Sequence, residues 1–369
     1  MRASLSGLVR GFSVSLLAGC SLPPAPLTEE SDDGTCSVPG ESEVYEVDEP
    51  VHLGACPSGR ECGVEDYLRL PQLFPGMGVD ITDEELDQRL RSRRDSAPEE
   101  RSVPSSADLR ARILSGTRID VLREGIADRP LEIAVIGEGD DLGAWAGEWL
   151  GIEPPRIQHR ELLVTDPLVG TLEVVVLLPD GEGPFPVVVV AHGHGDHPFR
   201  HIARGDFGEL FVDAGYALVL PWFRASEGGD EETVAARGLL KQGFNLTGVR
   251  MYEQLIGRRV AAWLPEADPC APVGLVGHSG GSVSSNLTVH APTRGLEFDA
   301  YVSDLISNYF NWSEEEGEHY LLDETVPDLW DVSQTVNGFE FVDIPVLQVP
   351  YGYPNGLDDL LGFFDDTIN

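Results

Sequence analysis

The chain has 369 residues and is strongly acidic: 63 aspartates and glutamates stand against 25 lysines and arginines, a formal net charge of -38 at pH 7. Such a surface repels phosphate backbones and anionic headgroups, so the composition excludes nucleic-acid binding and broad electrostatic docking on an acidic membrane. The length, with 41% hydrophobic residues, allows one large packed domain or two modest ones.

The segment 1–20 has the layout of a secretory signal. Arg2 and Arg10 precede a short apolar run, which is too short for an ordinary membrane span. The run ends in the letters LAGC, which resemble a bacterial lipobox with Cys20 as its cysteine. This resemblance implies that Cys20 is lipidated, becomes the mature N-terminus and anchors an exported protein to the bacterial cell envelope. Ser21 in the next position favours the outer membrane. A plain secretory signal with an incidental cysteine is the alternative.

The segment 21–75 is acidic and rich in proline, and it predicts a flexible tether behind that anchor. The four cysteines after Cys20 are Cys36, Cys56, Cys62 and Cys270. In an oxidising compartment they allow three disulfide pairings, and the short spacing favours Cys56 with Cys62. A metal cluster is the rival interpretation, but no CxxC spacing supports it.

Residues 76–152 predict a helical extension. Between 80 and 94 the acidic residues come early and the arginines late, which matches the dipole of a helix. Residues 106–123 have leucines at helical spacing, with Ser106 as a candidate cap.

From 153 to 369 short apolar runs alternate with segments of helical periodicity. Strands are predicted at 172–178, 187–191, 216–220, 273–277, 298–302 and 345–349, and helices at 202–214, 249–264 and 279–290. Strands that alternate with helices predict an α/β fold with a doubly wound, mostly parallel sheet covered on both faces.

The letters GHSGG at 277–281 carry the strongest chemical signal. They fit the pattern G-x-S-x-G and stand between an apolar strand and a predicted helix. A sharp turn there would present the hydroxyl of Ser279 at the carboxyl edge of the sheet, and small neighbours would avoid clashes. The amide of Gly280 would then point at a developing oxyanion, aided by the positive end of the helix. A glycine-rich turn without chemistry is the alternative.

Several segments in this order resemble the α/β-hydrolase fold, and within it the dienelactone hydrolase and acetyl xylan esterase type of carboxylesterase. The resemblance is carried by PFPVVVVAHGHG, GYALVLPWFRASEGG, GVRMYEQLIGRRVAAWL and GHSGG. It implies a serine esterase with Ser279 as nucleophile. It also implies an oxyanion hole in which Gly280 donates one backbone N–H and Gly193 or His194 the second. No organic cofactor is expected, since the sequence has no phosphate-cradling loop.

The letters HGHGDH at 192–197 also fit a second class of enzyme. Their H-x-H-x-D-H spacing resembles the dinuclear zinc site of the metallo-β-lactamase fold, where His278 and Asp304 would supply further ligands. Three observations favour the hydrolase. No series of β-sandwich hairpins precedes His192, helices and strands alternate between the two motifs, and the turn explains the small residues around Ser279. We therefore expect no metal and place 192–197 on the oxyanion loop or the pocket rim.

A hydrolase of this fold also needs an acid and a histidine, in the chain order serine, acid, histidine. The family pattern places the acid near Asn355, after the strand at 345–349, and Asp358 is our candidate. Asp304, at the end of the preceding strand, is the alternative. The last histidine of the sequence is His319, in an acidic stretch, so no imidazole follows the late strand.

Three explanations fit this gap. The sequence lacks the last strand and helix of the fold, which is the explanation we favour; or a relocated histidine is the base; or the fold binds without hydrolysis. The candidates for a relocated base are His319, His194, His197 and His201. We expect an exported, lipid-anchored hydrolase of a small-molecule ester, with a catalytically inactive binding lipoprotein as the alternative. The sequence leaves the substrate and the oligomeric state open.

Overall fold

The computed structural model describes residues 43–46, 81–95, 103, 105–140, 156–166, 170–202, 207–223, 229–268, 271–304, 339, 341–349 and 357–368. All of them belong to the compact unit Ser37–Asn369. The predicted signal, all five cysteines, Asn355 and His319 lie outside the described residues. Within these ranges no helix is long and apolar enough to cross a bilayer.

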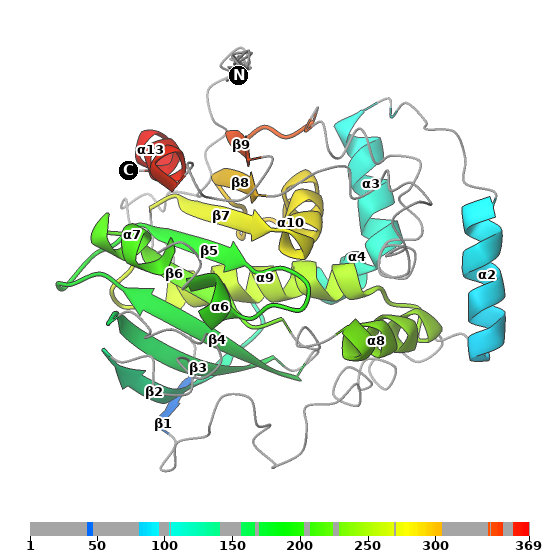
Figure 1. Cartoon of the computed structure of the whole chain (residues 1–369), viewed down its shortest axis with the longest axis horizontal. Coiled ribbons are helices and arrows are strands. Elements are labelled where there is room, and N and C mark those ends of the chain that lie inside the picture. Colours follow the sequence, from blue (N-terminus) through cyan, green and yellow to red (C-terminus); the bar gives the residue numbers. More distant parts are fainter. Residues whose placement is uncertain are drawn as a thin grey trace, which may run out of the picture. The chain divides into compact units, whose positions relative to one another are not determined.

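The described strands form one mixed sheet in the order β1-β2-β3-β4-β6-β5-β7-β8-β9 (Figure 1). The strands are β1 (Glu43–Glu46), β2 (Glu132–Gly139), β3 (Gln158–Asp166), β4 (Gly170–Leu178), β5 (Val187–Ala191), β6 (Ala217–Pro221), β7 (Val273–His278), β8 (Ala300–Asp304) and β9 (Val346–Val349). Strands β6, β5, β7, β8 and β9 run parallel, whereas β2, β3 and β4 pair antiparallel. The predicted α/β class with a mostly parallel sheet is confirmed.

The direction in which the chain adds strands to the sheet reverses after β6. The chain crosses from β5 to its neighbour β6 on one side, then returns past β5 to β7 on the other side. In open α/β sheets, ligands bind outside the carboxyl ends of the strands at such a switch point. The loops that follow β5 and β7 therefore meet where a site is expected.

Helices cover both faces of the sheet (Figure 1). They are α3 (Ser106–Thr117), α4 (Ile119–Arg123), α6 (Pro198–Ile202), α7 (Phe207–Asp213), α8 (Gly229–Lys241), α9 (Leu246–Trp263), α10 (Gly280–His290) and α13 (Leu357–Ile368). Residues of α3, α4, α8, α9 and α10 share one hydrophobic cluster with the sheet, and residues of α6, α7 and α13 share the other. One more helix, α2 (Asp83–Asp95), contributes none of its described side chains to either cluster that packs on the sheet.

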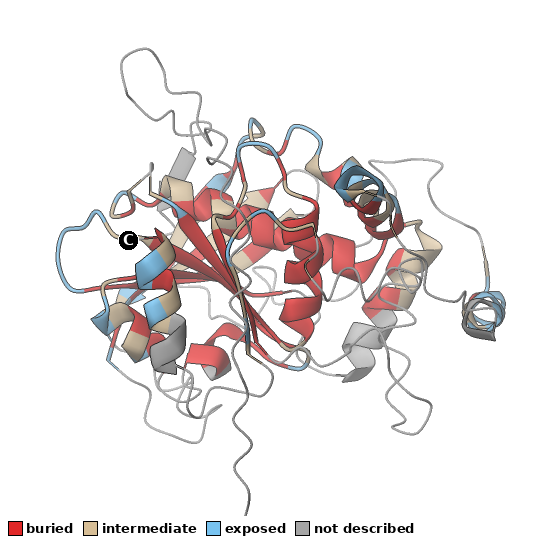
Figure 2. Cartoon of the chain, turned by 90° about the horizontal axis from the view of Figure 1, so that it is seen from above, coloured by how far each residue is buried: buried red, intermediate tan, exposed pale blue. Residues whose placement is uncertain are grey.

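Strand β4 shows why the apolar runs are continuous. Val174 and Val176 are packed in the cluster of α9 and α10, whereas Val175 and Leu177 are packed in the cluster of α6 and α7. Successive side chains of a strand point to opposite faces, so a strand buried on both faces is apolar at every position. Figure 2 shows these buried strands between the helices.

Helix α9 begins at a well-defined cap. The side chain of Asn245 accepts hydrogen bonds from the amides of Thr247 (2.9 Å) and Gly248 (3.3 Å), which satisfies two of the first amides of the helix. A Cβ on Gly248 would lie 1.9 Å from the carbonyl oxygen of Thr117, so the helix can approach the end of α3 only with glycine there. The cap and the glycine fix the start of the helix that leads to β7.

The amino-terminal segment differs from its prediction in three ways. The predicted helix 106–123 is divided into α3 and α4 at Arg118, whose φ is 60°. Its cap is Ser105, which accepts the amide of Asp108, rather than Ser106. Residues 132–139, within the segment expected to be helical, form β2 and join the sheet. The predicted helix at 80–94 is confirmed as α2.

Candidate active site

A sharp turn joins β7 to α10, and Ser279 is the residue at its corner. Its backbone has φ 49° and ψ -118°, a region that residues with a Cβ rarely adopt and that costs about 1–3 kcal/mol. The strand before it is fully buried and the residue after it is the first of an eleven-residue helix. The strand-to-helix context predicted for GHSGG is therefore confirmed, and the strain falls on the serine itself.

Hydrogen bonds to the end of β8 hold this turn. The amide of Ser279 donates to the carbonyl oxygen of Asp304 (3.0 Å), and the hydroxyl of Ser282 lies 2.7 Å from the same oxygen. The amide of Ser282 donates to the carbonyl of Ser279 (2.9 Å). Strain persists only where the surroundings impose it, and these bonds impose it. Ser279 is half-buried, whereas His278 and Gly280 on either side are buried.

Close packing requires glycine at two positions of the turn. A Cβ on Gly277 would lie 2.8 Å from the Cα of Ser282, and a Cβ on Gly281 would lie 2.2 Å from the carbonyl oxygen of Ala191. Side chains do not pack at such distances. The glycines therefore let α10 begin directly against β7 and against the end of β5.

The loop after β5 carries the histidines of HGHGDH, and their rings have different neighbours. The amide of Phe223 donates to Nε2 of His192 (3.0 Å), so the proton of this ring is on Nδ1, 3.0 Å from the carbonyl oxygen of Gly193. The ring of His197 packs against Trp222 with 5.7 Å between centroids. His192 thus ties the loop to the residues that follow β6.

The zinc interpretation needs these side chains to converge, and they do not. Across the described ranges, no group of three or more histidine, cysteine, aspartate or glutamate side chains is arranged to hold a metal ion. The parallel sheet also differs from the β-sandwich that the metallo-β-lactamase interpretation requires. For this part of the chain that alternative is wrong.

His194 lies over the first residue of α10. A Cβ on Gly280 would lie 2.1 Å from Cδ2 and 2.4 Å from Nε2 of His194, so the imidazole covers this glycine. A Cβ on Gly193 would lie 3.0 Å from the Cβ of Ser279. The three residues predicted for the oxyanion hole are therefore gathered around the serine. That their amides bind an oxyanion stays a prediction.

The other side of the His194 ring contacts a buried arginine. Nη1 of Arg250 lies 3.1 Å from Nδ1 of His194. Arg250 belongs to α9 and is 3% exposed. Arg250 lies 56 positions from His194 in the sequence, so no local pattern joins the two or predicts a role for the arginine.

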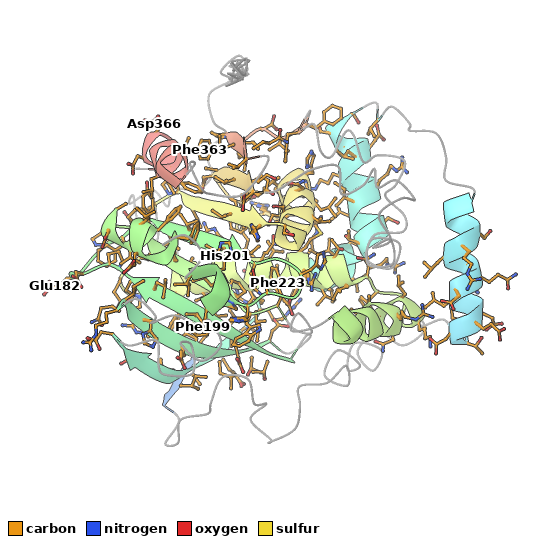
Figure 3. The ribbon with its side chains drawn as sticks, viewed as in Figure 1. Glu182, Phe199, His201, Phe223, Phe363 and Asp366 are labelled. Atoms are coloured by element: carbon orange, nitrogen blue, oxygen red, sulfur yellow. The ribbon has the colours of Figure 1, made fainter. Side chains whose placement is uncertain are left out.

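A buried imidazole–carboxylate pair lies beneath the turn. The register of β7 and β8 places His278 opposite Asp304, and the Nδ1 atom of the first is hydrogen-bonded to Oδ2 of the second. Asp304 is fully buried, and its Oδ1 atom has no hydrogen-bond partner among the described residues. The ring of His201, labelled on α6 in Figure 3, lies 5.3 Å from that of His278. His278 is a second residue to which the hydrolase interpretation had given no role.

Asp358, the candidate acid, lies in the first turn of α13, and its side chain is outside the described residues. Further along this helix, Phe364 packs on the start of β7: its Cε1 would lie 2.5 Å from a Cβ on Gly274. Gly274 precedes Ser279 by five residues, or about 16 Å along a strand. Figure 3 shows α13 apart from the residues labelled around α6. Phe364 lies six positions beyond Asp358, so this contact does not place the candidate acid, and the role of Asp358 stays untested.

No protein-family model and no curated protein matches the chain. Among solved structures, an acetyl xylan esterase from Paenibacillus sp. R4 is 12% identical, with a TM-score of 0.49 over 73% of this chain and 97% of that one. Acetyl xylan esterase 1 from Thermoanaerobacterium sp. JW/SL YS485 is 14% identical, with a TM-score of 0.41 over 74% and 98%. An S-formylglutathione hydrolase from Agrobacterium tumefaciens is 14% identical, with a TM-score of 0.39 over 64% and 99%. Likenesses this distant say nothing of activity, and the α/β architecture rests on the sheet itself.

Proposed function

We propose that this α/β chain is a serine hydrolase of carboxylic esters and that Ser279 forms the acyl-enzyme. The observation that carries the proposal is the strained backbone of Ser279 at the carboxyl edge of the parallel sheet, beside the switch point. A half-buried serine between a buried strand and the first turn of a helix is the arrangement of a nucleophile in this fold class.

The reaction proceeds in two halves. The Oγ atom of Ser279 attacks the carbonyl carbon of the ester while its proton passes to a base. The tetrahedral oxyanion then collapses, the bond to the alcohol oxygen breaks, and the alcohol leaves with that proton. Water attacks the acyl-enzyme in the same way, which releases the carboxylic acid and restores the serine hydroxyl. No electron is gained or lost, so the reaction needs no redox cofactor.

We assign the base to His278 and the acid to Asp304. The buried carboxylate holds Nδ1 of the imidazole, which orients the ring and stabilises the imidazolium that forms. Nε2 is then the nitrogen to which the serine proton passes. A Cβ on Gly193 would lie 3.3 Å from Cδ2 of His278, the ring carbon bonded to Nε2. It would lie 3.0 Å from the Cβ of Ser279. The ring edge and the serine therefore approach the same glycine.

The first amide of α10 supplies one donor for the oxyanion. Gly280 is the first residue of that helix, so no carbonyl of the same helix accepts its N–H, and the helix dipole adds a positive field. The amide of Gly193 or His194 supplies the second donor. Removal of one such donor costs about 3 kcal/mol of transition-state stabilisation.

Hydrolysis of p-nitrophenyl acetate and butyrate tests the proposal in three variants. Ser279→Ala should abolish turnover, His278→Gln should lower kcat by on the order of a thousandfold, and Ser106→Ala, at the start of α3, is the matched control. Turnover that survives Ser279→Ala, or that a strong chelator removes, contradicts the proposal. If Ser279→Ala is inactive but His278→Gln is not, only the base is wrongly assigned.

We also propose that the protein is exported and anchored through a lipid on Cys20. The support is the LAGC sequence after a short apolar run. Metabolic labelling with palmitate should mark the wild type and leave Cys20→Ala unlabelled. Equal labelling of the two contradicts the anchor without touching the proposed chemistry.

A further inference from the structure

We propose that the side chain of His194, held in one tautomer by Arg250, donates a further hydrogen bond to the oxyanion that forms on Ser279. This inference rests on the proposed ester hydrolysis and deepens it. His194 would be a catalytic residue through its Nε2–H group, in addition to any role of its backbone amide. Arg250, which acts through the imidazole, would be a positioning residue.

The chemistry of the contact fixes the tautomer. A guanidinium carries donors and no acceptor, so the Nδ1 atom of His194, 3.1 Å from Nη1 of Arg250, must accept. A neutral imidazole that accepts at Nδ1 carries its hydrogen on Nε2. While this contact holds, Nε2 is a donor and cannot take the serine proton, so His194 is excluded as the base.

The protonated nitrogen faces the start of α10. Nε2 would lie 2.4 Å from a Cβ on Gly280, the residue whose amide is the first proposed oxyanion donor. The side-chain N–H and that amide are therefore neighbours beside Ser279. Gly280 is buried and His194 is half-buried, and preorganised donors that are shielded from water stabilise a developing anion strongly.

The surroundings of Arg250 hold it in place. Its guanidinium carbon lies 5.7 Å from the centroid of the Phe223 ring, within the range of a cation–π contact. The amide of Phe223 in turn donates to His192, at the start of the loop that carries His194. The arginine therefore contacts both loops of the site from the rigid scaffold of α9, and its buried charge adds a positive field near the oxyanion.

The tautomer can be measured without turnover. Long-range ¹H–¹⁵N correlation spectra of protein labelled in histidine, with the signals of residue 194 assigned from His194→Gln, should show the hydrogen on Nε2. Arg250→Gln should introduce the Nδ1–H form. Arg258→Gln is the matched control, because Arg258 lies on the same helix and donates instead to the carbonyl of Glu297 (3.0 Å). An Nδ1–H tautomer in the wild type overturns the inference.

Kinetics test the role in the reaction. His194→Ala should lower kcat by about 100-fold with a much smaller change in KM, and His194→Gln, which keeps a side-chain N–H, should recover part of the loss. Arg250→Gln should lower kcat by about 10-fold in the wild type and have no further effect in His194→Ala. The affinity for a trifluoromethyl ketone analogue of the ester should fall in parallel.

The outcomes separate this inference from the proposed function. If Ser279→Ala abolishes hydrolysis while His194→Ala leaves kcat unchanged or raises it, the imidazole merely covers Gly280 and only this inference fails. If hydrolysis survives Ser279→Ala, the proposed function fails and the oxyanion role fails with it.

Discussion

Replacement of Ser279 by glycine should make the fold more stable while abolishing hydrolysis. At φ 49° and ψ -118° a residue with a Cβ is strained by about 1–3 kcal/mol, and glycine removes that strain. Glycine also loses more conformational entropy on folding, about 0.5–1 kcal/mol. The difference leaves a net gain of about 1 kcal/mol.

Differential scanning calorimetry measures this gain. About 1 kcal/mol corresponds to a rise in Tm of roughly 2 °C for a domain of this size. Ser279→Ala keeps the Cβ and the strain, so its Tm should stay near that of the wild type although both variants are inactive. Ser106→Gly, at the start of α3, supplies the control for the entropy of glycine in ordinary helical backbone and should lower Tm.

The Tm of Ser279→Gly relative to that of Ser279→Ala shows whether Ser279 is strained. If Ser279→Gly melts at or below the temperature of Ser279→Ala, the serine is not strained in solution. The main structural support for a nucleophilic turn would then be lost.

Three other substitutions have defined outcomes. Gly281→Ala would place a Cβ 2.2 Å from the carbonyl oxygen of Ala191, so it should lower Tm and remove hydrolysis, whereas Gly362→Ala, with no atom within 4 Å of the new Cβ, should not. Burial lowers the pKa of His290 from 6.5 to about 4, so on acidification the imidazole of the unfolded chain takes up a proton before that of the folded chain. The free energy of unfolding should therefore be highest above pH 6.5 and fall by about 3 kcal/mol as the pH drops to 4. Urea titrations at pH 7 and 4.5 should show a smaller loss for His290→Gln, and an equal loss would contradict this cause. Asn245→Ala removes the cap of α9 and should cost about 1 kcal/mol at neutral pH; an unchanged urea midpoint would contradict the capping role.

The parts of the fold that could be predicted from the sequence are those in which close packing dictates the residue types. The strands β5 and β7 are buried on both faces, so β5 is apolar throughout and β7 is apolar as far as Gly277, and both runs are visible in the sequence. The letters GHSGG were informative for the same reason. Gly277 and Gly281 are needed because atoms a few residues away, or on the next strand, leave no room for a Cβ.

Strands β2 and β3 escaped prediction because their patterns are broken. β2 mixes glycine and glutamate with its apolar residues, and its pairing with β3 shifts register between Val135 and Gly137. β3 begins with polar and charged residues and lies between β2 and β4, with both of which it pairs antiparallel. An irregular ladder gives no regular alternation in the sequence.

The chemistry of the candidate site depends on contacts that no local pattern encodes. Only the register of β7 and β8 brings His278 to Asp304, 26 positions later. Only the packing of α9 behind the loop after β5 brings Arg250 to His194. The sequence therefore pointed to the nucleophile and to the residues around it, but not to the groups that would set their proton positions.

A fluorophosphonate probe tests the central claim most directly, because it bonds covalently to an activated serine and to little else. Peptide mass spectrometry of the wild type should find one adduct, on Ser279, with a stoichiometry near one per chain. Ser279→Ala should carry none, and Arg258→Gln should react like the wild type. An adduct on a different residue, or no adduct in a preparation that hydrolyses esters, would contradict the assignment of Ser279 as the nucleophile.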